Sequence, residues 1–447
     1  MATTSKLFGT DGVRGVAGVF PLDPVTVARL GAALVRVLPK RDNVRLLVGR
    51  DTRESGPWLE QALAQGIASQ GATLTSLGIV PTPAVAFLTR AEGFDAGLVI
   101  SASHNPFADN GIKVFSGKGE KFDERLEGEI ESTIAGDGWS VDTQRAVGLE
   151  VVDLSDRYLE HARHACPDPR GLRGARIAVD CGNGATTPVA PRLLRAMGFD
   201  VTAIGCEPDG RNINLDCGST HPQRLADLVR QGRHKLGIAF DGDGDRAILV
   251  DANGSIVDGD AVMLMCAKHL KRTGRLKGPA VVATVMSNIG LELALKADGI
   301  DMVRCSVGDK YVMEEILKRD LSLGGEQSGH IIFSEFLFTG DGLVTALSVL
   351  NVMAETGREL ADLAGELVTY PQVLVNVRVA RKRDLTEEPS ILAVMRRVEE
   401  QLVGRGRLLV RYSGTEPLLR IMLEGQDQDQ IRIWAEEIAA AVRAALG

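Results

Sequence analysis

Three aspartates at alternate positions form the most specific chemical pattern in the chain. Asp241, Asp243 and Asp245 are separated by glycines and directly follow the apolar segment 236–240. In an extended loop such alternate side chains point the same way, and carboxylate oxygens are ligands that suit Mg²⁺. Three like charges beside a buried strand are costly without a cation, whereas the alternative is a solvated acidic turn. An EF-hand is excluded because residues 246–250 lead straight into a strand. The pattern therefore predicts a magnesium site suited to phosphoryl chemistry.

A serine follows a second apolar segment. Residues 98–100 are β-formers without alternation, as expected for a strand that is covered on both faces, and residues 101–106 (SASHNP) follow directly. Asn105-Pro106 prevents simple continuation of a strand or helix. These features predict that Ser103 is a nucleophile held on a tight turn in a cleft. The alternative is turn chemistry alone, since Ser, Asn and Pro are common turn residues.

A third loop combines an acid, a hydroxyl and an imidazole. Residues 326–330 (EQSGH) follow the apolar segment 321–323, which is predicted to be a strand. A carboxylate beside a serine matches vicinal sugar hydroxyls, and His330 is suited to general acid or base catalysis near neutral pH. A polar turn without a ligand is the open alternative.

Two arginine-containing loops indicate anion binding. Residues 411–417 (RYSGTEP) follow a predicted strand, and Arg420 lies nine residues after Arg411. Two guanidinium groups, two hydroxyls and glycine-freed amides are suited to a phosphate ester, while a surface turn is the alternative. Near the N-terminus, Arg14 lies between glycines in the loop 8–15, where it could approach an anion closely, or the loop could be a structural turn.

The elements that must position these loops repeat along the chain. Three times a strand is followed by a polar turn, a helix and a second strand, which predicts three similar α/β domains with mixed, mostly parallel sheets. The expected strands cover 44–48 and 73–77, 176–179 and 200–204, and 280–284 and 302–305, with helices at 57–70, 188–197 and 289–297. In such folds ligands bind beyond the carboxyl ends of strands, so the three loops are expected to meet in a central cleft.

The last segment has a different pattern. Strands at 373–379, 406–412 and 419–424, a helix near 391–403 and an amphipathic helix at 428–445 predict a smaller α+β domain. The predicted domains are 1–153 with the serine loop, 154–252 with the metal loop, 253–370 with the sugar loop and 371–447 with the phosphate loop.

Composition excludes several classes of protein. The chain has 447 residues and a net charge of -8, which argues against a nucleic-acid partner, since a nucleic-acid binder needs a basic face. No signal peptide or membrane-spanning segment is expected, so we predict a cytoplasmic protein without a membrane partner. Six scattered cysteines without CxxC spacing are expected to be free thiols. The sequence leaves open whether the protein forms a homodimer.

Taken together and in this order, the loops TDGVRG, SASHNP, DGDGDR, EQSGH and RYSGTEP closely resemble those of the α-D-phosphohexomutases, over essentially the whole chain. The resemblance implies a four-domain, heart-shaped molecule with a central cleft. It also implies that Ser103 carries a phosphoryl group, donates it to the sugar and recovers the other phosphoryl group from a bisphosphorylated intermediate.

The resemblance further implies roles for individual residues. Mg²⁺ would be bound by the Ser103 phosphate with Asp241, Asp243 and Asp245. Arg14, Lys113 and His330 match positions implicated in proton transfer and phosphate contact, and Lys310 matches a basic phosphate-contacting position more loosely. Contacts to sugar hydroxyls and phosphate are implied for Arg246, Glu326, Ser328, Arg411, Ser413, Gly414, Thr415 and Arg420.

Within this family, the opening FGTDG and Gln327 favour the branch that interconverts glucosamine 6-phosphate and glucosamine 1-phosphate, through glucosamine 1,6-bisphosphate, toward UDP-N-acetylglucosamine. Phosphomannomutase or phosphoglucomutase activity is the nearest alternative. A serine-based sugar phosphatase and a non-catalytic sugar-phosphate sensor are further alternatives. Both are disfavoured because the chain has the complete set of loops.

Overall fold

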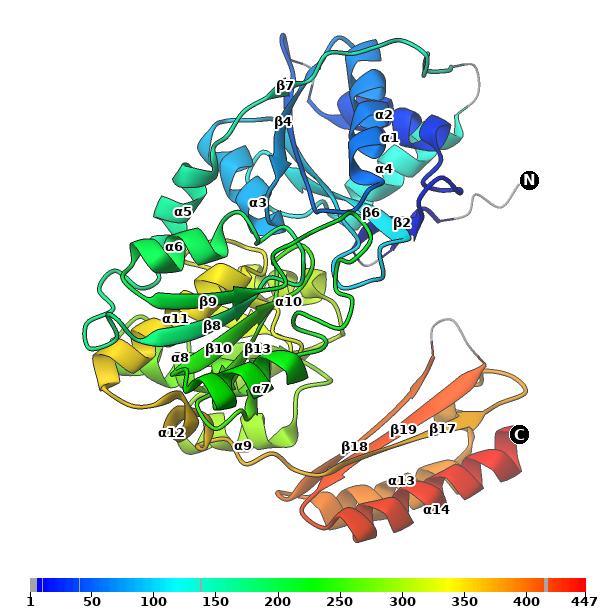
Figure 1. The fold of residues 1–447 in the computed structure, drawn as a ribbon. Helices are drawn as coiled ribbons and strands as arrows, with labels where there is room; N and C mark the ends of the chain where they lie inside the picture. The colour runs from blue at the N-terminus through cyan, green and yellow to red at the C-terminus, as the bar shows by residue number, and fades with distance from the viewer. Residues whose placement is uncertain (1–5, 10, 40, 137–138, 414–416) are drawn as a thin grey trace. The chain divides into compact units, whose positions relative to one another are not determined.

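The computed structural model describes residues 6–9, 11–39, 41–136, 139–413 and 417–447. Within these residues the strands form four sheets, shown with their helices in Figure 1. The chain divides into two compact units. The first comprises Met1–Met286 and Gly299–Glu366 and holds three of the sheets, and the second comprises Ser287–Asp298 and Leu367–Gly447 and holds the fourth.

The first sheet is mixed, and it positions the serine loop. Its order is β1-β2-β6-β5-β3-β4-β7, with parallel pairing among β3, β4, β5 and β7 and antiparallel pairing elsewhere. The strands are β1 (Phe8–Gly9), β2 (Gly12–Val16), β3 (Arg45–Arg50), β4 (Thr73–Ile79), β5 (Ala96–Ile100), β6 (Asp109–Ser116) and β7 (Glu150–Val151).

Helices cover both faces of this sheet. On one face α1 (Pro24–Val37), α2 (Gly56–Ser69) and α4 (Glu124–Ala135) share a hydrophobic core with Leu98 and Ile100 of β5. The other face of β5 lies against α3 (Thr82–Ala91), where a Cβ at Gly97 would lie 2.2 Å from Thr89 Oγ1. Coverage on both faces explains why β5 is apolar without alternation, as predicted.

The second and third sheets are also mixed. The second has the order β12-β11-β10-β8-β9 and the third β14-β13-β15-β16, with the parallel strands β8, β9 and β10 in one and β13, β14 and β15 in the other. The second sheet comprises β8 (Arg176–Asp180), β9 (Asp200–Ile204), β10 (Leu236–Phe240), β11 (Ala247–Asp251) and β12 (Ile256–Val257), and the third β13 (Ala280–Thr284), β14 (Asp301–Cys305), β15 (Leu323–Gly325) and β16 (Ile331–Phe333).

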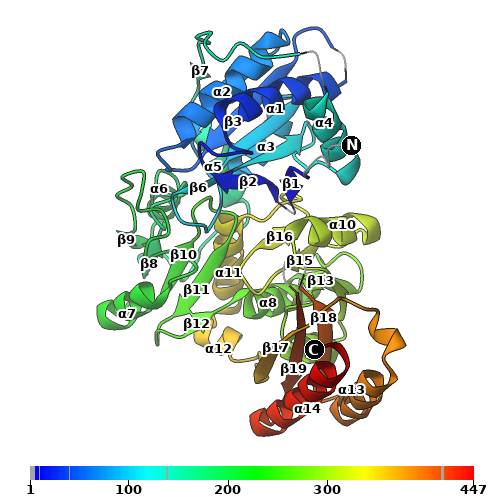
Figure 2. The same ribbon diagram turned by 90° about the vertical axis from the view of Figure 1, so that its right-hand side faces the viewer.

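Among the described residues, seven helices accompany these two sheets. They include α8, whose N-terminus is capped by Asp258, and α11, which is capped by Asp341. They are α5 (Ser155–Arg163), α6 (Ala190–Ala196), α7 (Gln223–Gly232), α8 (Gly259–Arg272), α10 (Asp309–Arg319), α11 (Gly342–Thr356) and α12 (Leu360–Ala364), and Figure 2 shows α10 beside β15 and β16.

The second compact unit contains an antiparallel sheet with the order β17-β19-β18. Two long helices, α13 and α14, cover one face of it and bury a separate hydrophobic core (Figure 1). Its elements are α9 (Ile289–Ala297), β17 (Gln372–Arg378), a short 3₁₀ helix (Leu385–Glu387), α13 (Pro389–Leu402), β18 (Gly406–Tyr412), β19 (Leu418–Gly425) and α14 (Gln428–Leu446).

The predicted fold class is confirmed, with three mixed α/β sheets and an antiparallel C-terminal sheet. The strand predicted at 321–323 is displaced, because β15 begins at Leu323 and includes two glycines. A Cβ at Gly324 would lie 2.9 Å from side-chain atoms of Val282 and Val312, so close packing requires glycine here and hides the strand from an apolar pattern.

Candidate active site

Ser103 lies at the first turn after β5, and its side chain faces the second sheet. Its Oγ donates a hydrogen bond to Asp241 Oδ2 at 2.6 Å, and the residue is only 1% exposed. Its φ of 51° is in the left-handed region, which is unfavourable for a residue with a Cβ. Ser101 supports this conformation, since its hydroxyl accepts a hydrogen bond from the Ser103 amide at 2.9 Å.

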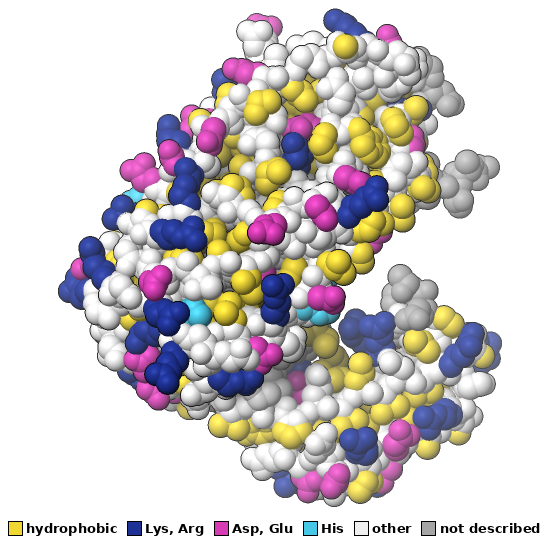
Figure 3. Space-filling model, in the orientation of Figure 1, with side chains coloured by type: hydrophobic (Ala, Val, Ile, Leu, Met, Phe, Trp, Pro, Cys, Tyr) yellow, Lys and Arg dark blue, Asp and Glu magenta, His cyan; other side chains and the backbone are white. Residues whose placement is uncertain are grey.

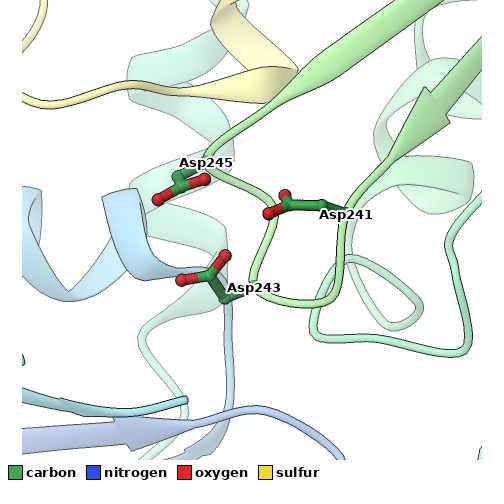
Figure 4. A group of neighbouring side chains, drawn as sticks. All are labelled: Asp241, Asp243 and Asp245. Atoms are coloured by element: carbon green, nitrogen blue, oxygen red, sulfur yellow. The ribbon is translucent and has the colours of Figure 1, made fainter. Parts of the chain in front are cut away.

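The three aspartates lie on the loop between β10 and β11 and converge on one point, as Figure 4 shows. One oxygen from each of Asp241, Asp243 and Asp245 lies within 4.8 Å of the others. The expected extended loop is wrong: the segment is a tight turn with Gly244 at φ 71°. The turn, and not alternation along a strand, brings the carboxylates together, because glycine allows the chain to fold around them.

The donor set fits a hard divalent cation. Asp243 Oδ1 is buried and has no hydrogen-bond partner among the described residues. Burial, together with the neighbouring carboxylates of Asp245 and Asp243, raises the pKa of Asp241 well above its ordinary value. Buried carboxylates that repel one another and leave an oxygen unpaired are stabilised by a cation with oxygen ligands, such as Mg²⁺.

Lys113 lies on β6, next to β5, and its ammonium group contacts the same carboxylates. Its Nζ is 2.8 Å from Asp243 Oδ2, 3.1 Å from Asp245 Oδ2 and 3.1 Å from Asp11 Oδ2. Burial alone would lower the pKa of Lys113, but these three carboxylates raise it well above the ordinary value. Lys113 is therefore a fixed positive charge at the aspartate loop.

A cavity of about 490 Å³ adjoins these groups. It brings together predicted site residues from three parts of the sequence, Arg14 from β2, Arg246 after the aspartate turn, and Glu326 and His330 around the turn between β15 and β16. The guanidinium of Arg14 forms an ion pair with Asp11, which also contacts Lys121. The cavity thus combines cations with hydrogen-bond acceptors, as a phosphorylated sugar requires.

His330 is fully enclosed between carboxylates at one side of this cavity. Its Nδ1 is 3.6 Å from Asp245 Oδ1 and its Nε2 is 3.5 Å from Asp309 Oδ2. The Gly340 amide donates to Nε2 at 3.0 Å, so the neutral ring carries its proton on Nδ1. Burial lowers the pKa of His330, but Asp245 and Asp309 outweigh burial and raise it above the ordinary value.

The sugar loop is held by its own hydrogen bonds. Glu326 accepts from the Gly308 amide at 3.0 Å and from the Ser328 hydroxyl at 3.2 Å. Gln327 donates its side-chain amide to Asp258 at 3.0 Å, at the N-terminus of α8. Gln327 thereby ties the loop to a helix end, and it is not among the residues lining the cavity.

Lys310 is the one predicted residue of the first unit that the structure places elsewhere. Its Nζ forms an ion pair with Glu127 of α4 at 3.0 Å, and it lines a different cavity, near Phe122 and Met313. From α10 its side chain reaches α4, whereas its neighbour Asp309 lines the site.

The phosphate loop lies in the second compact unit. Arg411 and Arg420 are direct partners in the pairing of β18 with β19, and Arg420 Nη2 is 3.4 Å from Ser413 Oγ. Two guanidinium groups on one face of a sheet, with a hydroxyl beside them, are suited to contact a phosphate. Gly414 and Thr415 lie outside the described residues.

His104 lies in the site, although the sequence patterns did not indicate a function for it. Its Nδ1 is 3.2 Å from Ser103 Oγ. Burial, with Arg246 and Arg14 nearby, lowers the pKa of His104 to about 4, so the ring is neutral at pH 7 beside the hydroxyl. Its place directly after Ser103 was the available signal.

Charged side chains of both signs lie on the surface of the first unit. On the face of the first unit drawn in Figure 3, Lys and Arg side chains are interspersed with Asp and Glu, without a continuous basic area. Among the helices that the structure describes, none has the length and apolar content needed to cross a bilayer.

Family models match the chain in four successive segments, described as phosphoglucomutase/phosphomannomutase alpha/beta/alpha domains I, II and III and the C-terminal domain, over residues 5–139, 156–254, 258–370 and 374–441. The chain therefore belongs to the phosphoglucomutase/phosphomannomutase family, and the resemblance to the phosphohexomutases is confirmed.

Among its relatives, a phosphoglucosamine mutase from Solibacter usitatus is 48% identical, with 99% of each chain covered. A solved phosphoglucomutase/phosphomannomutase family protein from Burkholderia thailandensis has a TM-score of 0.79 and 25% identity over 100% of this chain and 98% of its own. The N-acetylphosphoglucosamine mutase of Aspergillus fumigatus, solved with GlcNAc-6P and magnesium, shares the fold with a TM-score of 0.68 and 18% identity over 99% of this chain and 96% of its own.

Proposed function

We propose that the protein is a phosphoglucosamine mutase, an isomerase that interconverts glucosamine 6-phosphate and glucosamine 1-phosphate. The observation that carries this proposal is the buried Ser103 hydroxyl, 2.6 Å from Asp241, in a chain that is similar over its full length to phosphoglucosamine mutases. A hydroxyl beside convergent carboxylates is placed to hold a phosphoryl group next to a cation.

In the proposed reaction, the phosphoryl group of phospho-Ser103 passes to the free hydroxyl of the sugar phosphate. The bond from phosphorus to Ser103 Oγ breaks as the bond to the sugar oxygen forms, giving glucosamine 1,6-bisphosphate. The intermediate then reorients, and its other phosphoryl group returns to Ser103. Burial of Ser103 keeps water from the phosphoserine, which would otherwise be hydrolysed.

Arg14, Lys113 and His330 are the proposed catalytic residues. Lys113 supplies a fixed positive charge beside Asp243 and Asp245, and Arg14 lines the cavity where a phosphate would bind. His330 is the group among them that can gain and lose a proton near neutral pH, because Asp245 favours the protonated ring whereas the Gly340 amide, which donates to Nε2, favours the neutral one.

Asp241, Asp243 and Asp245, with an oxygen of the Ser103 phosphate, are the proposed Mg²⁺ ligands. When bound, the ion would neutralise charge on the transferring phosphoryl group. The unpaired Asp243 oxygen supports this assignment.

Substrate contacts are proposed for both compact units. Glu326 and Ser328 would hold sugar hydroxyls, and Arg246 would face the bound phosphate. The non-reacting phosphate would be held by Arg411, Ser413, Gly414, Thr415 and Arg420, and the cross-strand register that places Arg411 opposite Arg420 supports two guanidinium contacts to one phosphate. Lys310 would join them only after releasing Glu127.

The four-domain division at residues 153, 252 and 370 and the heart-shaped arrangement remain proposals. So does a cytoplasmic location, which six cysteines without disulfides support. Self-association as a homodimer stays open.

Specificity constants for glucosamine, glucose and mannose 6-phosphates, each with a trace of its bisphosphate, test the proposed substrate. We expect the glucosamine ester to be preferred at least about tenfold, a difference of about 1.4 kcal/mol. A preference for glucose or mannose would instead identify a phosphoglucomutase or phosphomannomutase, which the family also includes.

A further inference from the structure

The left-handed turn at Ser103 is held by donors that do not belong to the cavity. The carbonyl oxygen of Ser103 accepts a hydrogen bond from Arg53 Nη2 at 3.0 Å and another from Asn214 Nδ2 at 2.9 Å. The carbonyl oxygen of Asn105 accepts from the same two atoms, at 2.8 Å and 3.3 Å. Arg53 also donates to the Pro106 carbonyl.

Arg53 is itself fixed in place. Its guanidinium is completely buried and pairs with Asp51, with Nε 2.9 Å from Asp51 Oδ2. Asp51 also accepts from the Ser101 hydroxyl at 2.6 Å, and that hydroxyl in turn holds the Ser103 amide. The serine turn is therefore fixed from both its amide and its carbonyl side.

Asn214 joins this turn to the aspartate loop. Asn214 comes from the loop between β9 and α7. Its φ of 58° is also in the left-handed region, an unfavourable backbone conformation for a residue with a Cβ. A Cβ on Gly242, between two of the aspartates, would lie 2.5 Å from the Ser103 carbonyl oxygen and 2.8 Å from Asn214 Nδ2. The serine turn, Asn214 and the aspartate loop thus pack without room for a methyl group.

We propose that Arg53 and Asn214 are positioning residues that hold the Ser103 peptide in its left-handed conformation and so aim Oγ at the aspartates for phosphoryl transfer. The proposal rests on the proposed function for its reaction. Neither residue is among those lining the cavity, so their contribution is expected in kcat and not in KM.

The decisive variant is Asn214→Asp. It keeps the shape of the side chain but replaces the donor Nδ2 with a carboxylate oxygen, which would face the carbonyl oxygens of Ser103 and Asn105. We expect kcat to fall about 10- to 100-fold, with KM within about twofold of wild type. Asn214→Ala should fall less, because it leaves the carbonyls without repulsion. Asn212→Ala is the matched control, since its side chain contacts only its own exposed loop, and it should retain wild-type kcat.

Arg53→Lys gives a second test, because a lysine keeps the charge but lacks the planar group that reaches three carbonyls. Thermal unfolding shows whether each variant is folded. The fraction of protein that carries phosphate on Ser103, measured by intact mass, gives the concentration of active enzyme from which kcat is calculated. A corrected kcat within about twofold of wild type in both Asn214→Asp and Arg53→Lys would overturn the proposal, as would an equal loss in Asn212→Ala.

The same experiment separates this proposal from the proposed function. A wild-type protein that accepts the 1-phosphoryl group of glucosamine 1,6-bisphosphate on Ser103 and releases glucosamine 6-phosphate, but converts no added glucosamine 6-phosphate into glucosamine 1-phosphate, would refute the function alone. The positioning role is then judged by the rate of Ser103 phosphorylation, which should fall about 10- to 100-fold in Asn214→Asp.

Discussion

Ser103 Oγ and Asp241 Oδ2, 138 positions apart in the sequence, lie 2.6 Å from each other. The hydroxyl comes from the end of a strand in the first sheet and the carboxylate from the end of a strand in the second. Both belong to the first compact unit, so this contact is a property of one packed body. This contact joins the proposed phosphoryl carrier to the proposed metal ligands.

Removal of the Ser103 hydroxyl should abolish mutase activity. Ser103→Ala is expected to lose at least about 1,000-fold in kcat and to lack the covalent phosphate, which adds about 80 Da to the intact mass of wild type. Ser101→Ala distinguishes the two serines, because the Ser101 hydroxyl donates to Asp51 and accepts from the Ser103 amide, whereas the Ser103 hydroxyl contacts the aspartate loop. It should still carry phosphate, and a phosphate lost only in Ser101→Ala would move the nucleophile.

Asp243 should be needed for metal binding even without substrate. Mg²⁺ is expected to raise the unfolding temperature of wild type, because a ligand that binds only the folded state stabilises it. Asp243→Asn should lose this shift and at least about 100-fold in kcat, while Asp227→Asn, at an exposed position of α7, should keep both. An Mg²⁺ shift retained in Asp243→Asn would contradict the metal assignment.

Arg411 should act on substrate binding and not on the serine. Arg411→Ala is expected to raise KM for glucosamine 6-phosphate about 10- to 100-fold, the effect of losing one charge-assisted contact to phosphate. Its phosphoserine content should be unchanged, since the residue lies in the other compact unit. Arg432→Ala, on the exposed side of α14, is the control, and an equal KM for both variants would refute the phosphate site.

Asp341 should make stability depend on pH. Burial raises the pKa of Asp341 to about 6 in the folded protein, and its Oδ2 has no hydrogen-bond partner among the described residues. The folded state then binds the proton more tightly than the unfolded state, so the free energy of unfolding falls as pH rises from about 4 to 7. The loss attributable to Asp341 is about 3 kcal/mol.

Asp341→Asn tests this dependence, because the amide keeps an oxygen to cap α11. Urea unfolding at several pH values should show the variant gaining stability relative to wild type as pH rises through this range. Parallel curves for the two proteins would show that Asp341 titrates normally.

Local sequence patterns were sufficient for much of the fold. β5 and β10 are apolar and covered on both faces, and the polar turns after them carry Ser103 and the aspartates as predicted. These features are encoded within a few residues, because a buried strand and the turn that ends it have distinct compositions. The strand predicted at 321–323 was misplaced, because Gly324 of β15 is required by contacts with Val282 and Val312, which are distant in sequence.

The fine geometry of the site could not be predicted in this way. The roles of Arg53 and Asn214 depend on carbonyl groups 50 and 111 positions away, respectively. The pairing of Lys310 with Glu127 depends on how α10 packs against α4. Residue type indicates what a side chain can bind, whereas the partner that it does bind is decided by packing between elements.

The central claim is that Ser103 exchanges phosphoryl groups between two positions of one amino sugar. The most direct test is ³¹P NMR of glucosamine 6-phosphate mixed with the wild-type protein, Mg²⁺ and a trace of glucosamine 1,6-bisphosphate. We predict that the glucosamine 1-phosphate signal grows to equilibrium while inorganic phosphate stays at its initial level. Growth of inorganic phosphate without glucosamine 1-phosphate would identify a phosphatase, and an unchanged spectrum a binding protein, and either result would contradict the account.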